Sequence, residues 1–130
     1  MDLEVPSLVV VAAGGAMGAM ARLAVTNQFH RWFGTHFPWG TLAVNLSGAL
    51  LAGMIANRLT MTGEIDLSLA WLGLIVGILG GYTTVSSFSL QTLTLWQSGH
   101  LAHAIGNILA TLMAGLAMVV LGWVLAGGPL

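Results

Sequence analysis

The chain is dominated by four long apolar stretches separated by short polar segments. They run over roughly residues 6–25, 39–57, 71–96 and 101–125. Each stretch is long enough to cross a bilayer as a helix, because a crossing takes about 20 residues at a rise of about 1.5 Å per residue. The last two stretches contain no charged residue. The pattern therefore predicts an all-α integral membrane protein, with four transmembrane helices in a single domain over residues 1–130.

Composition agrees with a location in the lipid bilayer. Charged residues make up 5% of the chain and hydrophobic residues 57%, whereas a soluble domain carries about 25% charged residues. Five tryptophans fall at or near the ends of the stretches, as in an aromatic belt: Trp32, Trp39, Trp71, Trp96 and Trp123. The absence of cysteine excludes disulfides and thiolate metal sites. The absence of a basic patch argues against nucleic acid as a partner.

The third stretch contains a segment that is poorly suited to a continuous helix. Gly80 and Gly81 precede a run of hydroxyl and β-branched residues that ends at Ser89. Glycine and β-branched residues weaken a helix, and hydroxyls compete for its backbone. We therefore predict that the third helix is broken mid-membrane, near residues 80–86. Carbonyls freed by a break can hold a cation, and freed N–H groups or hydroxyls can face an anion. The alternative is a kinked packing helix whose hydroxyls bond back to its own backbone.

Other polar residues at membrane depth allow two readings each. Asn45 is expected either to form an interhelical hydrogen bond or to donate its amide hydrogens to a permeating anion. Asn107 and Thr111, one turn apart, are expected to make polar contacts between helices. Arg22 either extends to the headgroups or attracts anions into a vestibule.

The acidic residues all lie outside the predicted spans, at Asp2, Glu4, Glu64 and Asp66. Coupled cation transport generally needs an ionisable group within the membrane, so this arrangement favours an anion or a small neutral solute. The sequence also lacks a Ser-His-Asp constellation, a Walker loop and a metal cluster, which argues against an enzyme. With four spans, Arg22 and Arg31 would lie on one side of the membrane and Arg58 on the other, so the arginines are nearly balanced. This weak bias permits insertion in both orientations.

Three segments together carry a resemblance to a known family: Gly18–Arg22, Gly40–Gly48 and Gly80–Ser89. With these segments in a four-span chain of this length, the sequence resembles the Fluc (CrcB) small fluoride channels of bacteria and other microbes. The resemblance implies a passive, fluoride-selective channel that exports cytoplasmic fluoride. It also implies a multi-pass protein of the cell membrane, which is the inner membrane of a prokaryote.

The resemblance further implies an assembly and a set of site residues. The assembly would be a dual-topology antiparallel homodimer with two pores. Asn45, Ser86, Phe88 and Ser89 would line the fluoride path, and Arg22 would lie in the vestibule. Backbone carbonyls of Gly80 and Thr83 would hold a structural Na+ at the dimer interface.

Two positions depart from the family pattern, and two other functions remain open. Val85 stands where the family has the first of two phenylalanines at the break, so only Phe88 remains. A gapless alignment of the fourth span places Val119 where some members carry a hydroxyl. A small dual-topology multidrug exporter would have the same size, but such exporters rely on a glutamate in the first span, which is absent here. A non-transporting membrane assembly subunit is the other alternative.

Overall fold

The computed structural model describes residues 5–62 and 72–129, and all the regular structure in these residues is helical. The first two helices are α1 (Val5–Phe33) and α2 (Trp39–Thr62). The third column consists of the π-helical segment η1 (Leu72–Leu79), α4 (Gly80–Tyr82), a break, and α5 (Ser86–Gln97). The fourth column runs continuously through α6 (Leu101–Leu109), the π-helical segment η2 (Ala110–Ala114) and α7 (Gly115–Leu125).

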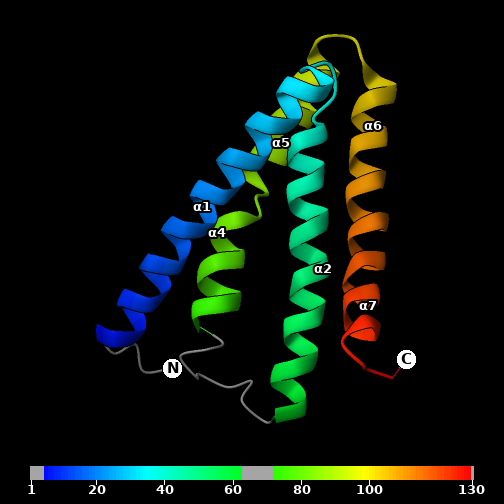
Figure 1. Cartoon of the computed structure of the whole chain (residues 1–130). Helices are drawn as coiled ribbons and strands as arrows, with labels where there is room; N and C mark the ends of the chain where they lie inside the picture. Colours follow the sequence, from blue (N-terminus) through cyan, green and yellow to red (C-terminus); the bar gives the residue numbers. More distant parts are fainter. Residues whose placement is uncertain (1–4, 63–71, 130) are drawn as a thin grey trace.

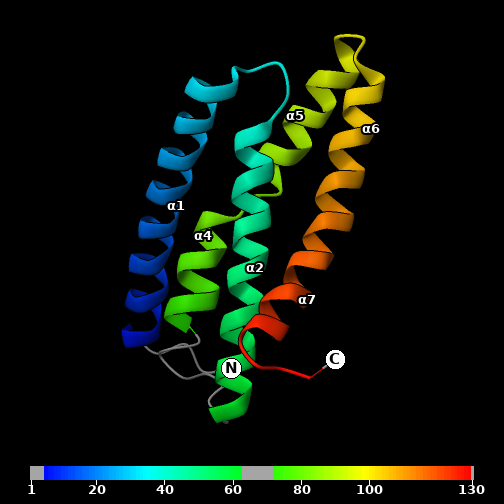
Figure 2. The same cartoon turned by 45° about the vertical axis from the view of Figure 1, so that its right-hand side comes forward.

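The four columns run up and down with short connections between them (Figure 1). The α1–α2 and α5–α6 connections lie at the same end of the molecule, which we call the loop end. The end of α7 lies at the opposite end of the molecule, which is also the end where α1 starts (Figure 2). The closest helix pairs are α2 with α7 and α1 with η1 and α4, while α5 packs mainly against α6.

Three helices are long and apolar enough to cross a membrane: Val5–Phe33, Trp39–Arg58 and Leu101–Leu125. The broken third column is the fourth element of the predicted set. The predicted bounds are confirmed for the fourth span and for the start of the second at Trp39, although α2 continues to Thr62. Residue 71, the predicted start of the third span, lies outside the described residues.

The predicted end of the first span was wrong, because α1 continues to Phe33. Nothing interrupts the helix before Gly34, whose φ of 76° favours glycine and ends it. The extra turns are stabilised by aromatic contacts: the Phe29 ring centroid lies 5.6 Å from those of Trp32 and Phe33, three and four residues on. The connection to α2 is therefore confined to residues 34–38.

Glycines allow two pairs of helices to approach until their backbones touch. A Cβ at Gly18 would meet the carbonyl oxygen of Ile78, and one at Gly81 would meet that of Gly15. On the other side of the molecule, Gly53 of α2 lies against the backbone of α7 at Val119. Small residues at helix interfaces allow this close packing in membrane proteins. This packing fixes α1 against the segment that leads into the break.

Candidate functional site

The third helix is interrupted at residues 83–85, within the predicted region. Thr83 has an extended conformation, with φ −78° and ψ 158°. The carbonyl oxygen of Leu79 accepts hydrogen bonds from both the N–H and the hydroxyl of Thr83, each at 2.9 Å. The Thr84 hydroxyl accepts the Ser87 N–H at 3.1 Å and so caps the start of α5. The helix is thus broken, and threonine hydroxyls also bond back to its backbone.

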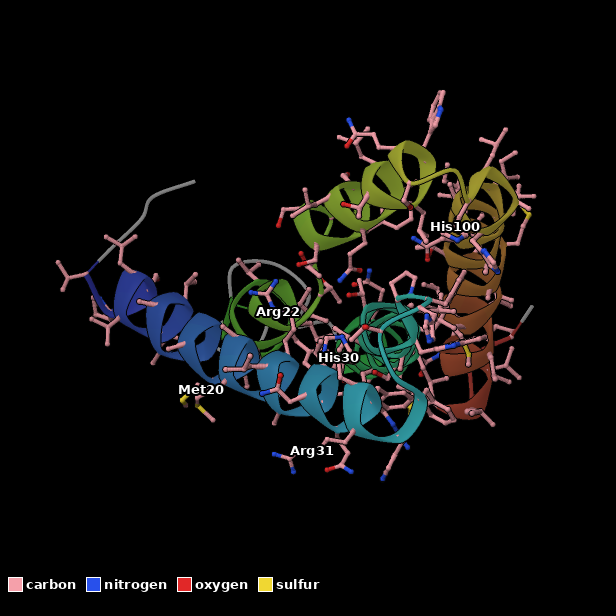
Figure 3. All side chains as sticks on the ribbon, turned by 90° about the horizontal axis from the view of Figure 1, so that it is seen from above. Met20, Arg22, His30, Arg31 and His100 are labelled. Atoms are coloured by element: carbon pink, nitrogen blue, oxygen red, sulfur yellow. The ribbon has the colours of Figure 1, made fainter. Side chains whose placement is uncertain are left out.

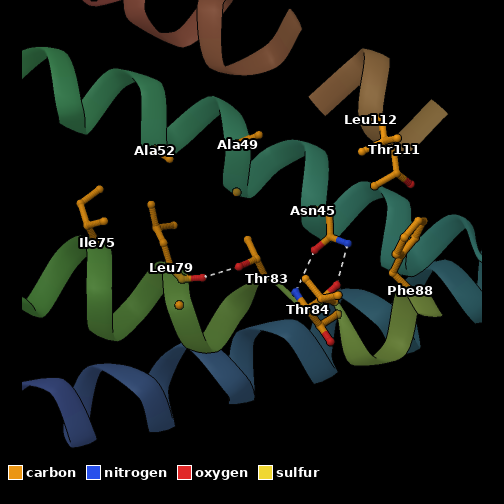
Figure 4. Close-up of a pocket in the computed structure, with 13 residues that line it drawn as sticks. Asn45, Ala49, Ala52, Ile75, Leu79, Thr83, Thr84, Phe88, Thr111 and Leu112 are labelled. Carbon is orange, nitrogen blue, oxygen red and sulfur yellow. Dashed lines mark hydrogen bonds between the residues drawn. The ribbon is translucent and has the colours of Figure 1, made fainter. Parts of the chain in front are cut away.

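Asn45 on α2 pairs with the backbone of the break through two hydrogen bonds (Figure 4). Its Nδ2 donates to the carbonyl oxygen of Thr84 at 3.0 Å, and its Oδ1 accepts the Thr84 N–H at 2.9 Å. The interhelical reading of Asn45 is therefore confirmed. One amide hydrogen remains free of these two bonds, since an amide group carries two. The role of Asn45 as a donor to an anion stays a prediction.

The hydrogen bonds at the break leave two backbone carbonyls without their usual helical donors. In a regular helix, the Thr84 N–H would donate to the Gly80 carbonyl and the Ser87 N–H to the Thr83 carbonyl. Here, these two donors go to Asn45 Oδ1 and to the Thr84 hydroxyl instead. Gly80 and Thr83, the two predicted Na+ ligands, therefore lose the usual partners of their carbonyls. Gly80 itself lies in α4, just before the break.

A mostly apolar cavity of about 560 Å³ lies on one side of the break. Figure 4 shows it between α2, the third column and the fourth column. Phe88, Thr111 and Val85 contribute to its lining, as do Gly80 and Thr83. Val85 is 76% exposed, so the position of the missing phenylalanine is open.

A second, more polar cavity of about 380 Å³ lies on the other side of Thr84. Arg22 lines it together with Thr26, Thr41, Ser87 and Gln91. Seen from the loop end, Arg22 and His30 point from α1 toward the interior, whereas Met20 and Arg31 point away (Figure 3). Arg22 is half-buried. The vestibule role of Arg22 stays a prediction.

The two predicted serines, Ser86 and Ser89, do not line these two cavities. Ser86 begins α5 and lies 3.1 Å from the Thr84 hydroxyl, oxygen to oxygen. Ser89 is exposed on α5 and lines neither cavity. The sequence reasoning missed Thr41, Ser87 and Gln91. The spacing of four residues between Ser87 and Gln91 was the available signal, because it places them on one helix face.

The fourth column contributes two polar residues near the break. Asn107 is 1% exposed, and its Nδ2 donates to the Thr92 hydroxyl at 2.9 Å. That hydroxyl donates in turn to the carbonyl oxygen of Phe88 at 2.7 Å. The expected polar contact between helices is confirmed for Asn107. The Thr111 hydroxyl is buried, has no hydrogen-bond partner among the described residues, and lines the larger cavity.

Among the described residues, no cluster of three or more His, Cys, Asp or Glu side chains is positioned to hold a metal ion. Alkali ions accept backbone carbonyl oxygens as ligands, and such carbonyls are present at the break. Four hydrophobic columns, the third of them broken and re-paired through Asn45, define an integral membrane protein.

Comparison with known proteins identifies the family of this chain. The family described as "CrcB-like protein, Camphor Resistance (CrcB)" matches residues 9–123, and the chain belongs to this family. It is 41% identical over 122 residues to "Fluoride-specific ion channel FluC 2" of Bradyrhizobium diazoefficiens, covering 93% of this chain and 89% of the relative. It is 42% identical over 120 residues to "Fluoride-specific ion channel FluC" of Nitrobacter winogradskyi, covering 92% and 90%.

A third relative is longer than this chain. The protein named "Fluoride-specific ion channel FluC" of Methylococcus capsulatus is 43% identical over 124 residues, which cover 92% of this chain but 52% of that relative. These relatives are named as ion channels, so the expectation that the chain is not an enzyme agrees with its family.

Proposed function

We propose that this chain forms a passive, fluoride-selective channel that exports cytoplasmic fluoride across the cell membrane, the inner membrane of a prokaryote. The observation that supports this most directly is the pairing of Asn45 with Thr84. It stabilises a broken helix between a cavity that contains Phe88 and a polar cavity that contains Arg22. The names of the relatives indicate the anion.

Neutral donors carry the anion in this proposal. Fluoride is small and strongly hydrated, so a pore must replace its water with firm hydrogen-bond donors. The free amide hydrogen of Asn45, the hydroxyls of Ser86 and Ser89, and the positive edge of the Phe88 ring supply this kind of contact. Arg22 attracts the anion into the polar cavity without standing in the narrow part.

The functional unit is a dual-topology antiparallel homodimer with two pores. The larger cavity is open, apolar and bordered by the exposed Val85, a surface that a second copy would cover. The near balance of arginines lets copies insert in opposite orientations. The lipid bilayer is the other partner of the chain.

Backbone carbonyls at the break fit a structural Na+. Gly80 and Thr83 both line the larger cavity, and their carbonyls have lost their usual helical donors. Two carbonyls are too few ligands for an alkali ion, but a second copy related by a twofold axis would double them. A Na+ held there would contribute positive charge and rigidity at the dimer interface.

Fluoride efflux from liposomes containing the purified protein tests the function. We expect fluoride to leave on addition of an ionophore for the counter-cation, while chloride in a parallel sample is retained. Fluoride efflux no faster than from empty liposomes would refute the proposal. Proton-coupled movement of an organic cation would support a multidrug exporter instead. Co-purification of a second protein, without any flux, would support an assembly subunit.

Val85→Phe tests the pathway more sharply. Val85 is 76% exposed beside Phe88, so a phenyl ring is expected to fit and to add a second polarised edge. The substitution should preserve or raise the rate of fluoride efflux. Val120→Phe, at an exposed position on α7, is the control for added aromatic bulk. Loss of efflux in Val85→Phe alone would contradict the role of Phe88 in the path.

A further inference from the structure

Two polar faces oppose each other between α1 and α5. On α1, Arg22, Thr26 and His30 follow at intervals of four residues, which places them on one face. Figure 3 shows Arg22 and His30 pointing inward from α1. On α5, Ser87 and Gln91 have the same spacing. These faces line the polar Arg22 cavity between the break and the loop end.

A third cavity of about 260 Å³ continues these faces at the loop end. His30 and His36 line it, together with Thr35 and Thr94. Gln91 lines both this cavity and the Arg22 cavity, so the two adjoin at its side chain. The Gln91 Oε1 atom is buried and has no hydrogen-bond partner among the described residues. Buried polar atoms of this kind are commonly satisfied by water, so Gln91 offers a hydrogen-bond acceptor to water between the two cavities.

No negative charge in the described chain opposes these histidines. Residues 5–62 and 72–129 contain no Asp or Glu. The other charged or titratable groups at the loop end are Arg31, which points outward from α1, His100 just before α6, and His103 on α6. His103 packs against Phe37, with ring centroids 6.1 Å apart. A protonated histidine carries a positive charge, so the electrostatic potential of the cavity becomes more positive when His30 or His36 gains a proton.

We infer that the His30–His36 cavity is the mouth of the anion path and a weak binding site for small hydrated inorganic anions, occupied more often when its histidines are protonated. The inference rests on the proposed function. The anion is held there by water-mediated and electrostatic contacts, and passes Gln91 to reach Arg22. Two added charges in a solvated mouth correspond to an increase of about two- to fivefold in anion concentration at low ionic strength.

Fluoride currents in planar bilayers test this inference, because neutral HF carries no charge and does not contribute. The purified protein is measured at low, non-saturating NaF, with the pH changed on both sides from 8 to 5.5. We expect conductance to rise about two- to fivefold, and the rise to shrink when an impermeant salt raises the ionic strength. The double variant His30→Gln and His36→Gln should show the same conductance at both pH values.

The double variant His100→Gln and His103→Gln is the matched control. It removes two histidines from the same end but outside the cavity, and should keep the pH response. A wild-type conductance that does not change with pH overturns the inference, as does an undiminished response in the His30 and His36 variant. The single variants His30→Gln and His36→Gln replace the double variant if it does not purify as a folded protein. Absence of any fluoride current refutes the proposed function and this inference with it.

Discussion

Asn45 takes over the hydrogen bonds that the third helix loses at its break. Its side-chain amide supplies both an acceptor and a donor to the backbone of Thr84. Within a bilayer, each unpaired backbone group costs several kcal/mol, because no water replaces the missing partner. One side chain on α2 therefore makes the break tolerable. It also frees the Gly80 carbonyl, so a single residue connects the stability of the site to its proposed chemistry.

The variant Asn45→Asp separates these two contributions. The carboxylate retains an acceptor for the Thr84 N–H but loses the donor to the Thr84 carbonyl, and it repels an approaching anion. We expect stability to fall by about 1–3 kcal/mol and fluoride efflux to fall sharply. Thermal unfolding in detergent and liposome efflux measure the two effects. Ser98→Ala, which removes an exposed hydroxyl at the end of α5, should leave both unchanged. Unchanged efflux in Asn45→Asp would remove Asn45 from the path.

Sequence patterns predicted the residue types at the site better than their partners. Asn45 and the break itself followed from polarity and helix propensity within a hydrophobic stretch, whereas Phe88 followed from the resemblance to the family. The pairing of Asn45 with Thr84 did not, because it depends on the register between α2 and the third column. Gln91 was not predicted. It lines two cavities because of where the fold places α1 and α5, and the sequence pattern does not reveal that placement.

Two pairs of helices, α1 with η1 and α4, and α2 with α7, meet through backbone contact. The face of α1 that bears Gly14 and Gly18 lies directly on η1 and α4. This contact holds the segment before the break, while α5 after it is held mainly by α6. The two halves of the third column are thus supported by different neighbours. Such support agrees with an interruption that persists instead of closing into a continuous helix.

Two alanine substitutions on α1 test this packing. A Cβ at Gly18 would collide with the backbone of Ile78 and Tyr82, which cannot move aside as a side chain can. Gly18→Ala should therefore destabilise the protein by about 1–3 kcal/mol, and should lower fluoride efflux by displacing α4. A Cβ at Gly15 meets only ordinary contact, 4.0 Å from the Gly77 carbonyl oxygen.

Gly15→Ala is therefore the matched control on the same helix. Alanine favours a helix over glycine by about 0.5–1 kcal/mol, so its thermal stability should equal or exceed that of the wild type. Equal unfolding temperatures for the two variants in detergent would show that the close approach of α1 to the third column does not support the fold.

The distribution of charge over the whole molecule determines which orientations the chain can adopt. Arg31 lies at the loop end, Arg58 lies near the opposite end, and Arg22 lies within α1. Topology follows an excess of lysine and arginine in the short segments beside the spans, and this chain has almost none. An antiparallel dimer needs both orientations in comparable amounts. The scarcity of charge is thus a requirement of the proposed assembly as well as a mark of the membrane.

Two designs that place the excess of positive charge at opposite ends of the molecule test this requirement. The first design, Arg58→Gln with Gln97→Lys, concentrates positive charge at the loop end. The second, Arg31→Gln with Leu125→Lys, concentrates it at the opposite end. Gln97 and Leu125 are exposed positions. Each design should insert in one orientation and, expressed alone, should give cells or liposomes little fluoride efflux, because antiparallel partners are missing. Co-expression of both designs should restore efflux. The added substitution Ser98→Cys reports the orientation of each design, because the cysteine is labelled from one side of the membrane only when all copies insert the same way. A design that is labelled from one side only and still gives full efflux alone would exclude the antiparallel dimer.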